Sequence, residues 1–223
     1  VWLNLPNVIQ VGDNFLHDNE VLKSLNVPNL EQIGSGFLFQ NKGLESFDAP
    51  KLKVVGYGFF LKNEVLRSLN VPNLEQVGNS FLYQNKGLGS FDAPKLKVAG
   101  NDFLYRNEVL RSLNAPNLEQ VGSRCLFQNK RLDSFDATKL KIVGNDFLYR
   151  NEVLKSLNLP DLEEKGTGFL WSNLTLSNTN SIDSKNIAIL DKNNKVTESE
   201  MNLVKRIINR FRDSFKNMFK NSR

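Results

Sequence analysis

The chain has 223 residues, of which 40% are hydrophobic and 24% charged, proportions that are ordinary for a folded soluble protein. No apolar run approaches the ~20 residues of a membrane-spanning helix. One cysteine and one histidine exclude a disulfide framework, a Cys/His zinc site and a Cys-His or Ser-His-Asp catalytic set. We therefore expect no catalytic residues, no metal ligands and no cofactor. The formal charge of +5 is concentrated in residues 201–223, which hold seven basic residues and one acidic, so the near-neutral remainder argues against binding of nucleic acid.

Most of the chain, residues 1–176, repeats every 22 positions. Similarity is stronger at twice this period, because residues 63–106 match residues 107–150 at 34 of 44 positions, whereas the two halves of 63–106 agree at 10. A fixed period of this size predicts a solenoid, in which one unit stacks on copies of itself. The chain begins within a repeat, so we expect it to be part of a longer protein. About eight turns are marked by one asparagine each, at Asn19, Asn41, Asn63, Asn85, Asn107, Asn129, Asn151 and Asn173.

Each turn is predicted to contain one short strand, in the L-x-S-L-x-V segment exemplified by residues 66–71. All seven prolines of the chain follow this segment in a single column. Since proline cannot donate to a strand ladder, it marks the end of the strand. An invariant glycine, Gly12 through Gly166, predicts either a positive φ or a close approach of two backbones. We expect the Phe-Leu pair that follows, such as Phe103-Leu104, to be buried against the opposite wall.

These columns carry a family resemblance. The pattern L-x-x-I-x-I-P followed by I-G-x-x-A-F is matched by Leu66, Leu69, Val71, Pro72, Val77, Gly78 and Phe81. The chain thus resembles the BspA-like (Treponema-type) leucine-rich repeat family, although its repeat is one residue shorter and Phe-Leu replaces Ala-Phe. The resemblance implies a mainly β (α+β) solenoid, a leucine-rich-repeat stack with one parallel sheet. It also implies a non-catalytic protein-binding scaffold in a bacterial surface or secreted protein.

Two columns of charged residues alternate in sign from turn to turn. Equivalent residues of stacked strands lie about 4.8 Å apart, so one repeated charge would repel itself along the whole array, whereas alternation pairs each acid with bases. We interpret the columns as ladders that set the register of the turns; a recognition surface is the alternative. One column runs Glu31, Lys53, Glu75, Lys97, Glu119, Lys141 and Glu163. The other runs Glu20, Lys42, Glu64, Lys86, Glu108, Lys130 and Glu152.

Several polar or reactive residues have structural explanations. The asparagine column is interpreted as buried amides that bond the backbone of the bend between turns, and the serine column, Ser24 through Ser156, is expected to do similar work. Cys125 lies in a phenylalanine column and is predicted to be a buried small hydrophobe. His17 lies in an aromatic column and is interpreted as a substitute for a ring there.

Two surfaces are candidates for partner recognition. In Phe-Leu-Tyr, three successive bulky residues cannot all face inward, so the third column is predicted to be a partly exposed aromatic stripe suited to protein binding. Close packing between turns is the alternative. The candidate residues are Phe39, Tyr83, Tyr105, Phe127, Tyr149 and Trp171. Outward residues of the strand face, suited equally to recognition or to solvation, are Arg67, Asn70, Asp92, Arg111, Asn114 and Asp136.

After residue 176 the columns fail, and residues 177–196 are predicted to be a linker with a capping strand. Thr197 and Glu200 form a capping box that opens a basic amphipathic helix over residues 197–223. This helix suits an anionic membrane or a partner's groove; the alternative is that it folds back as a cap on the array or leads into a further domain. Its candidate contact residues are Lys205, Arg206, Phe211, Phe215 and Phe219. We therefore expect the whole chain to be a non-catalytic protein-binding scaffold, as the resemblance implies, with a membrane-associating module or a structural spacer as alternatives.

Overall fold

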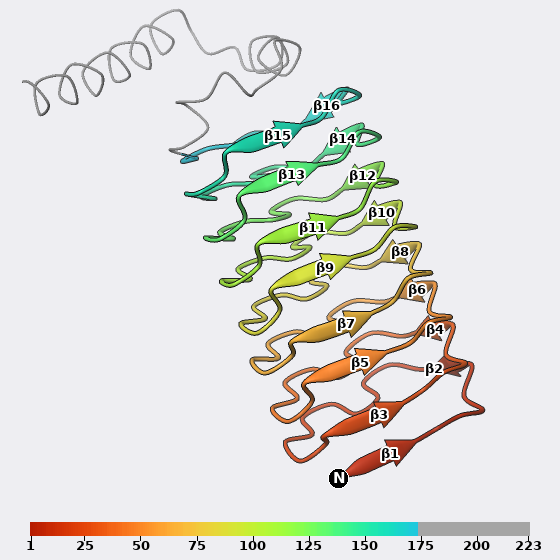
Figure 1. Cartoon of the computed structure of the whole chain (residues 1–223). Helices are drawn as coiled ribbons and strands as arrows, with labels where there is room; N and C mark the ends of the chain where they lie inside the picture. Colours follow the sequence, from red (N-terminus) through yellow and green to blue (C-terminus); the bar gives the residue numbers. More distant parts are fainter. Residues whose placement is uncertain (174–223) are drawn as a thin grey trace, which may run out of the picture. The chain divides into compact units, whose positions relative to one another are not determined.

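The computed structural model describes residues 1–173, which form a stack of parallel β coils (Figure 1). Every 22-residue turn contributes one three-residue strand and one two-residue strand. The three-residue strands are β1 (Trp2–Asn4), β3 (Ser24–Asn26), β5 (Ser46–Asp48), β7 (Ser68–Asn70), β9 (Ser90–Asp92), β11 (Ser112–Asn114), β13 (Ser134–Asp136) and β15 (Ser156–Asn158). The two-residue strands are β2 (Gln10–Val11), β4 (Gln32–Ile33), β6 (Val54–Val55), β8 (Gln76–Val77), β10 (Val98–Ala99), β12 (Gln120–Val121), β14 (Ile142–Val143) and β16 (Glu164–Lys165).

The three-residue strands lie inside the segment predicted from the sequence. In β9, Ser90 and Asp92 face solvent while Phe91 is buried, as the two-residue period of a strand requires. Proline ends each of these strands within two residues, with Thr138 standing in its place after β13. Pairing joins residues 22 apart, for example Phe47 with Leu69, so the solenoid register predicted from the repeat is confirmed.

The prediction of one parallel sheet is wrong, because the two-residue strands form a second, continuous sheet. This sheet has eight strands in the order β16-β14-β12-β10-β8-β6-β4-β2. Most of these strands expose their first residue, as Gln76 in β8, and bury their second, as Val77; in β10 and β14 the first residue is half-buried. A segment of two residues is too short to give a periodic hydrophobic signal, which explains why the pattern alone did not reveal it.

The three-residue strands pair two by two, and this gives the 44-residue period a structural meaning. We call the boundaries β1/β3, β5/β7, β9/β11 and β13/β15 closed, because each joins three residue pairs. The boundaries β3/β5, β7/β9 and β11/β13 are open: the first and third share a single residue pair, and β7 and β9 form no ladder. The face is consequently divided into two four-stranded sheets, which meet where β7 faces β9.

Different side chains bridge the two kinds of boundary. At closed boundaries an asparagine amide donates to the residue one turn below, as Asn114 Nδ2 does to Asp92 Oδ1 at 2.7 Å. At open boundaries lysines reach across, as Lys95 Nζ does to Asn73 Oδ1 at 2.6 Å. Ion pairs at the open boundaries join Lys42 to Glu20 and Lys86 to Glu64. Other ion pairs lie where strands are paired, as Lys53 to Glu31 just before β6 and β4.

The core is a set of columns that run through the stack. The predicted leucine columns are buried, and phenylalanine rings stack between turns, with Phe59 and Phe81 at 5.1 Å between centroids. Of the two explanations for the glycine column, close approach of two backbones is confirmed, and these glycines do not have a positive φ. A Cβ on Gly78 would lie 2.7 Å from the carbonyl carbon of Gly56, closer than van der Waals contact allows. The Phe-Leu pair Phe103-Leu104 is fully buried, as predicted.

In the segment that follows the glycine, every second residue has a left-handed backbone conformation. Asp102, Leu104 and Arg106 have φ of 58°, 54° and 54°, in the left-handed region that L-residues usually avoid. Their amides bond alternately to the next and the previous turn: Asp102 N donates to Ser123 O, and Leu104 N to Phe81 O. Inter-turn hydrogen bonds therefore offset the strain and join successive turns along this wall.

The linker with its capping strand, predicted for residues 177–196, and the basic helix predicted for residues 197–223 lie outside the described residues. Within residues 1–173, no helix is long and apolar enough to cross a membrane.

Candidate binding surfaces

The third aromatic column brings four of its predicted residues into one stack. Successive rings lie face to face, at 4.6 Å between Tyr83 and Tyr105, 4.9 Å between Tyr105 and Phe127, and 4.8 Å between Phe127 and Tyr149. We call these four residues the aromatic ladder. Leu61 interrupts the column below it.

The other residues of this column stand apart from the aromatic ladder. Phe39 stacks on His17, with 4.8 Å between their ring centroids, so the prediction that His17 replaces a ring is confirmed. The side chain of His17 also lies 2.8 Å from Asp18 Oδ2. Trp171 is 62% exposed and makes no ring contact with another described residue.

The rings of this column are closely packed through their faces, and most of them are partly exposed. Tyr83, Phe127 and Tyr149 are half-buried and Tyr105 is 9% exposed. Burial, together with the nearby Tyr105 and Asp102, raises the pKa of the Tyr83 phenol, so the hydroxyl is neutral at physiological pH. The ladder therefore presents a row of ring edges and neutral hydroxyls in fixed positions.

Arginines flank the aromatic ladder. The guanidinium carbons of Arg106 and Arg124 lie 5.3 and 5.9 Å from the Tyr105 ring centroid, and that of Arg150 lies 5.4 Å from the Tyr149 centroid. Arg106 Nε also donates to Gln128 Oε1 at 2.6 Å, which holds its side chain across two turns. This rim is cationic, and each guanidinium is close enough for a cation–π attraction.

The strand-face candidates behave differently from the ladder. Asn70, Asp92, Asn114 and Asp136 are exposed, but they belong to the asparagine-to-aspartate bonds of the closed boundaries, as in Asn70 Nδ2 to Asp48 Oδ1 at 2.9 Å. Arg67 and Arg111 are exposed at the entrances of their strands. The polar row on this face therefore has a structural role in addition to being accessible.

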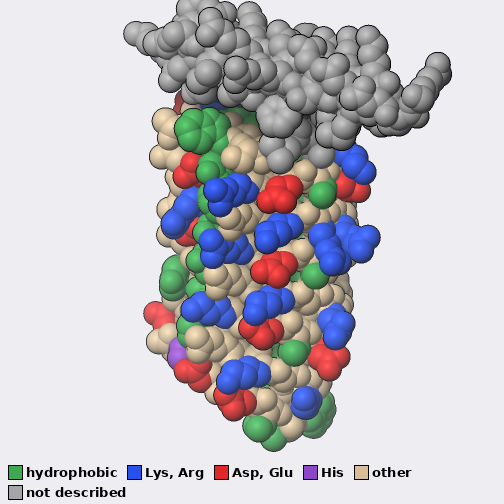
Figure 2. Space-filling view, turned by 90° about the vertical axis from the view of Figure 1, so that its left-hand side faces the viewer, with side chains coloured by type: hydrophobic (Ala, Val, Ile, Leu, Met, Phe, Trp, Pro, Cys, Tyr) green, Lys and Arg blue, Asp and Glu red, His purple; other side chains and the backbone are tan. Residues whose placement is uncertain are grey.

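The alternating charge columns are visible as rows of red and blue side chains on one face of the array (Figure 2). Four of the expected pairs are close: Lys42–Glu20, Lys53–Glu31 at 2.8 Å, Lys86–Glu64 at 2.6 Å and Lys141–Glu163 at 3.8 Å. The hydrogen bond and charge of Lys86 lower the pKa of Glu64, and Glu64 likewise raises the pKa of Lys86.

The asparagine column acts as predicted. Asn129 is fully buried, its amide donates to Leu104 O at 2.9 Å, and its Oδ1 accepts the N–H of Asn107 at 2.9 Å. The same donor contact recurs from Asn41 to Asn173, each time to a residue 25 positions earlier. The expectation for the serine column is wrong, because Ser24 through Ser156 point outward from the three-residue strands.

Cys125 is a buried small hydrophobe, as predicted. Its thiol is fully buried, lies 3.2 Å from Gly100 O, and has a pKa raised to about 12 by burial. A thiol of this kind is protonated and unreactive at neutral pH. Among residues 1–173, no three His, Cys, Asp or Glu side chains lie together as a metal site would require.

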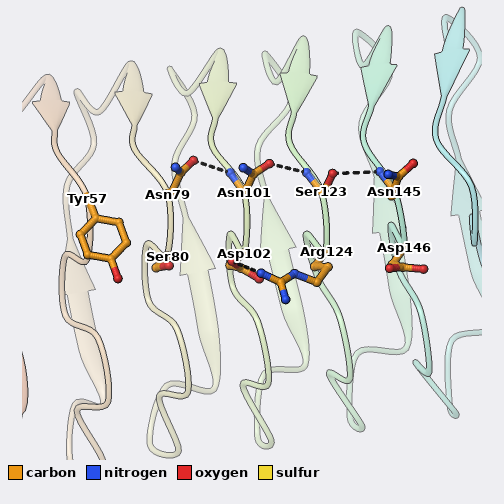
Figure 3. A pocket seen from close by; sticks show the side chains of 9 residues that line it. All are labelled: Tyr57, Asn79, Ser80, Asn101, Asp102, Ser123, Arg124, Asn145 and Asp146. Carbon is orange, nitrogen blue, oxygen red and sulfur yellow. Dashed lines mark hydrogen bonds and ion pairs between the residues drawn. The ribbon is translucent and has the colours of Figure 1, made fainter.

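A polar groove, not predicted from the sequence, lies at the corner after the glycine column (Figure 3). Its volume is about 510 Å³. The residue that follows the glycine differs between turns, for example Ser35, Tyr57 and Asn79, so the repeat pattern did not indicate a groove there. The lining residues are Tyr57, Asn79, Ser80, Asn101, Asp102, Ser123, Arg124, Asn145 and Asp146.

Stacked 22-residue turns, a buried asparagine ladder and leucine columns together match a known repeat. The model of the BspA type leucine rich repeat region matches residues 2–111 and 80–198, in six copies. The chain belongs to the BspA-type leucine-rich repeat family. No match was found among curated proteins or among solved structures. In BspA-type repeats, as in leucine-rich repeats generally, the solenoid is an interaction scaffold, and the candidate surfaces of this member are the aromatic ladder, the strand face and the groove.

Proposed function

We propose that this array is a non-catalytic protein-binding module of a bacterial surface or secreted protein, and that the aromatic ladder is its main contact surface. The observation that carries the proposal is the face-to-face stacking of Tyr83, Tyr105, Phe127 and Tyr149, with ring edges left exposed. Aromatic residues dominate the energetic centres of protein interfaces. Rings that are already fixed lose little conformational entropy when a partner binds.

The arginines beside the aromatic ladder also support its assignment as the contact surface. Arg106, Arg124 and Arg150 lie beside the tyrosine rings, and tyrosine with arginine is the composition enriched at the centres of interfaces. The strand-face amides are, by contrast, engaged with one another across the closed boundaries. A partner would have to displace those bonds, whereas ring edges and phenol hydroxyls are free to be covered.

The test replaces two ladder rings while keeping the fold. Leu61 occupies the same column and is well buried, so Tyr83→Leu and Tyr149→Leu are compatible with the stack. The variant Arg67→Gln on the strand face is the matched control. Proteins from host and bacterial extracts are captured on the wild-type array and on each variant, with melting temperatures measured in parallel.

We expect the ladder variants to lose at least one wild-type partner, by about tenfold in affinity for each ring removed, while Arg67→Gln retains it. Equal capture by folded ladder variants and wild type would overturn the assignment of the ladder. Loss of the partner with Arg67→Gln alone would move the binding surface to the strand face.

A further inference from the structure

The polar groove holds a row of hydrogen-bond donors whose orientation is fixed by the fold. Asn79 Oδ1 accepts the backbone N–H of Asn101 at 2.8 Å, and Asn101 Oδ1 accepts that of Ser123 at 2.8 Å. Asn145 Oδ1 accepts the N–H of Thr167 at 2.9 Å. Each side-chain oxygen thereby accepts a bond from the next turn, and no amide nitrogen of these three side chains has a hydrogen-bond partner among the described residues. One donor therefore faces the groove in each of these turns.

The hydroxyl of Ser123 fills the gap in this row. Its oxygen accepts the N–H of Asn145 at 3.2 Å, so its proton is available to a ligand. Figure 3 shows these four side chains in one line across successive turns. Because neighbouring turns of parallel strands are about 4.8 Å apart, the donors repeat at that interval. A ligand that fits them carries acceptors at a similar, regular spacing.

The second row of the groove carries charge of both signs. Arg124 Nη2 lies 2.8 Å from Asp102 Oδ2, and the Asp102 side chain is only 10% exposed. Its other oxygen, Oδ1, has no hydrogen-bond partner within residues 1–173. Asp146 follows one turn later, so the row holds two carboxylates and one guanidinium. This balance disfavours a polyanion, while the acceptors and donors together suit hydroxyl groups, which do both.

Tyr57 ends the groove with an aromatic surface. Its side chain is 53% exposed, and its column otherwise holds small polar residues. The next residue, Gly58, occupies the position that Ser80 and Asp102 fill in later turns, so no side chain crowds the ring there. The negative face of an aromatic ring attracts the weakly positive C–H groups of a flat, partly apolar ligand.

We propose that this groove binds a neutral oligosaccharide in an extended conformation, one sugar stacking on Tyr57 and the following sugars bonding to the amides of Asn79, Asn101 and Asn145. Sugars combine the three features that the groove requires: C–H faces for the ring, hydroxyls for the donors and carboxylates, and regular repetition along a chain. The groove adjoins the aromatic ladder, because Arg124 lines the groove and also lies beside Tyr105, but the inference does not depend on the proposed protein partner.

Two substitutions have precedents in the same column, so they test binding without loss of the fold. Tyr57→Ser introduces the residue found at Ser35 and Ser123. Asn101→Asp keeps the oxygen that accepts from Ser123 but removes the donor, and Asp13 already plays this role, accepting from Ser35 N at 2.6 Å. Val21→Ser, at an exposed position outside the groove, is the control.

Isothermal titration of the full chain uses neutral hexasaccharides of glucose, N-acetylglucosamine, mannose and galactose, each with its sulfated analogue. We expect at least one neutral hexasaccharide to bind, with affinity falling about tenfold in Tyr57→Ser and about fivefold in Asn101→Asp, and unchanged in Val21→Ser. The proposal is overturned if none binds at up to about 10 mM. It is equally overturned if neither groove variant weakens binding, or if sulfated chains bind more tightly than neutral ones.

Discussion

Lys86 Nζ lies 2.6 Å from Glu64 Oε1, across the boundary where the described strands β7 and β9 form no ladder. Lys141 and Glu163 directly precede β14 and β16, which pair in the continuous sheet, and here Lys141 Nζ lies 3.8 Å from Glu163 Oε1. Of these two ion pairs, the shorter one lies where the strands form no ladder. The Lys42–Glu20 and Lys86–Glu64 pairs thus bridge boundaries at which the three-residue strands pair weakly.

Glu64→Gln should therefore destabilise the array more than Glu163→Gln. Both pairs are exposed, so the effects are small and decline as salt screens them. The measurement is the urea midpoint of each variant at low and at high salt. Charge reversal by Lys86→Glu, which places three adjacent glutamates in the column, should lower the midpoint further. Equal effects of Glu64→Gln and Glu163→Gln at low salt would refute the link between ion pairs and open boundaries.

The pH dependence of this pair follows from its pKa shifts. Lys86 lowers the pKa of Glu64 below 4.5, so the stability contributed by that carboxylate is present above pH 4.5 and is lost as pH falls through its folded value. Glu64 raises the pKa of Lys86 above 10.5, so the contribution of the lysine is lost as pH rises through that raised value. The difference in urea midpoint between wild type and Glu64→Gln should be constant from pH 5 to pH 10. It should shrink below about pH 4.5; a difference that grows on acidification would contradict the assignment.

Removal of a buried asparagine should be far more costly than loss of any surface pair. Asn129→Ala deletes the donor to Leu104 O and the acceptor of Asn107 N–H, which leaves two buried backbone groups unsatisfied. We expect the free energy of unfolding to fall by about 2–4 kcal/mol, against less than about 0.5 kcal/mol for the exposed control Ser112→Ala. Chemical denaturation measures both, and similar values for the two variants would show that the amide ladder is dispensable.

Substitution by glycine should change the free energy of unfolding in opposite directions at two glutamines. Gln84 has a φ of 57°, where glycine is free of steric strain, so Gln84→Gly should raise the free energy of unfolding by about 0.5–1 kcal/mol. Gln120 lies in β12, where Gln120→Gly should lower it by a similar amount. Denaturation curves of the two variants give the signs directly, and a loss of stability in Gln84→Gly would mean that the left-handed alternation is not strained.

The sequence predicts the features that are repeated identically in every turn. Leucine, asparagine, glycine and proline recur at 22 residues because each turn buries or bends at the same place, so their columns identify the core and the bends. The Asn/Asp alternation from Asn70 to Asp136 carried the same kind of signal as the Glu/Lys columns, and could have been recognised as a third ladder. Its positions instead suggested either a recognition surface or plain solvation.

The features that escaped prediction depend on short or non-repeated segments. The second sheet consists of two-residue strands such as Gln76–Val77, which are too brief to display a period. The open boundary between β7 and β9 reflects backbone geometry that strands of almost identical sequence do not reveal. The groove depends on Tyr57, which departs from its column, and on Asp102, whose column varies from turn to turn, and only stacking of the turns brings them to one surface.

The most direct test of the account places a photoreactive benzophenone amino acid at single positions of the array and exposes it to bacterial and host extracts. Benzophenone at position 149, in place of a ladder tyrosine, and at position 127 should give the same covalent partner. Position 67 on the strand face should not give it. Adducts from position 67 alone, or identical yields from all three positions, would contradict the claim that the aromatic ladder is the contact surface.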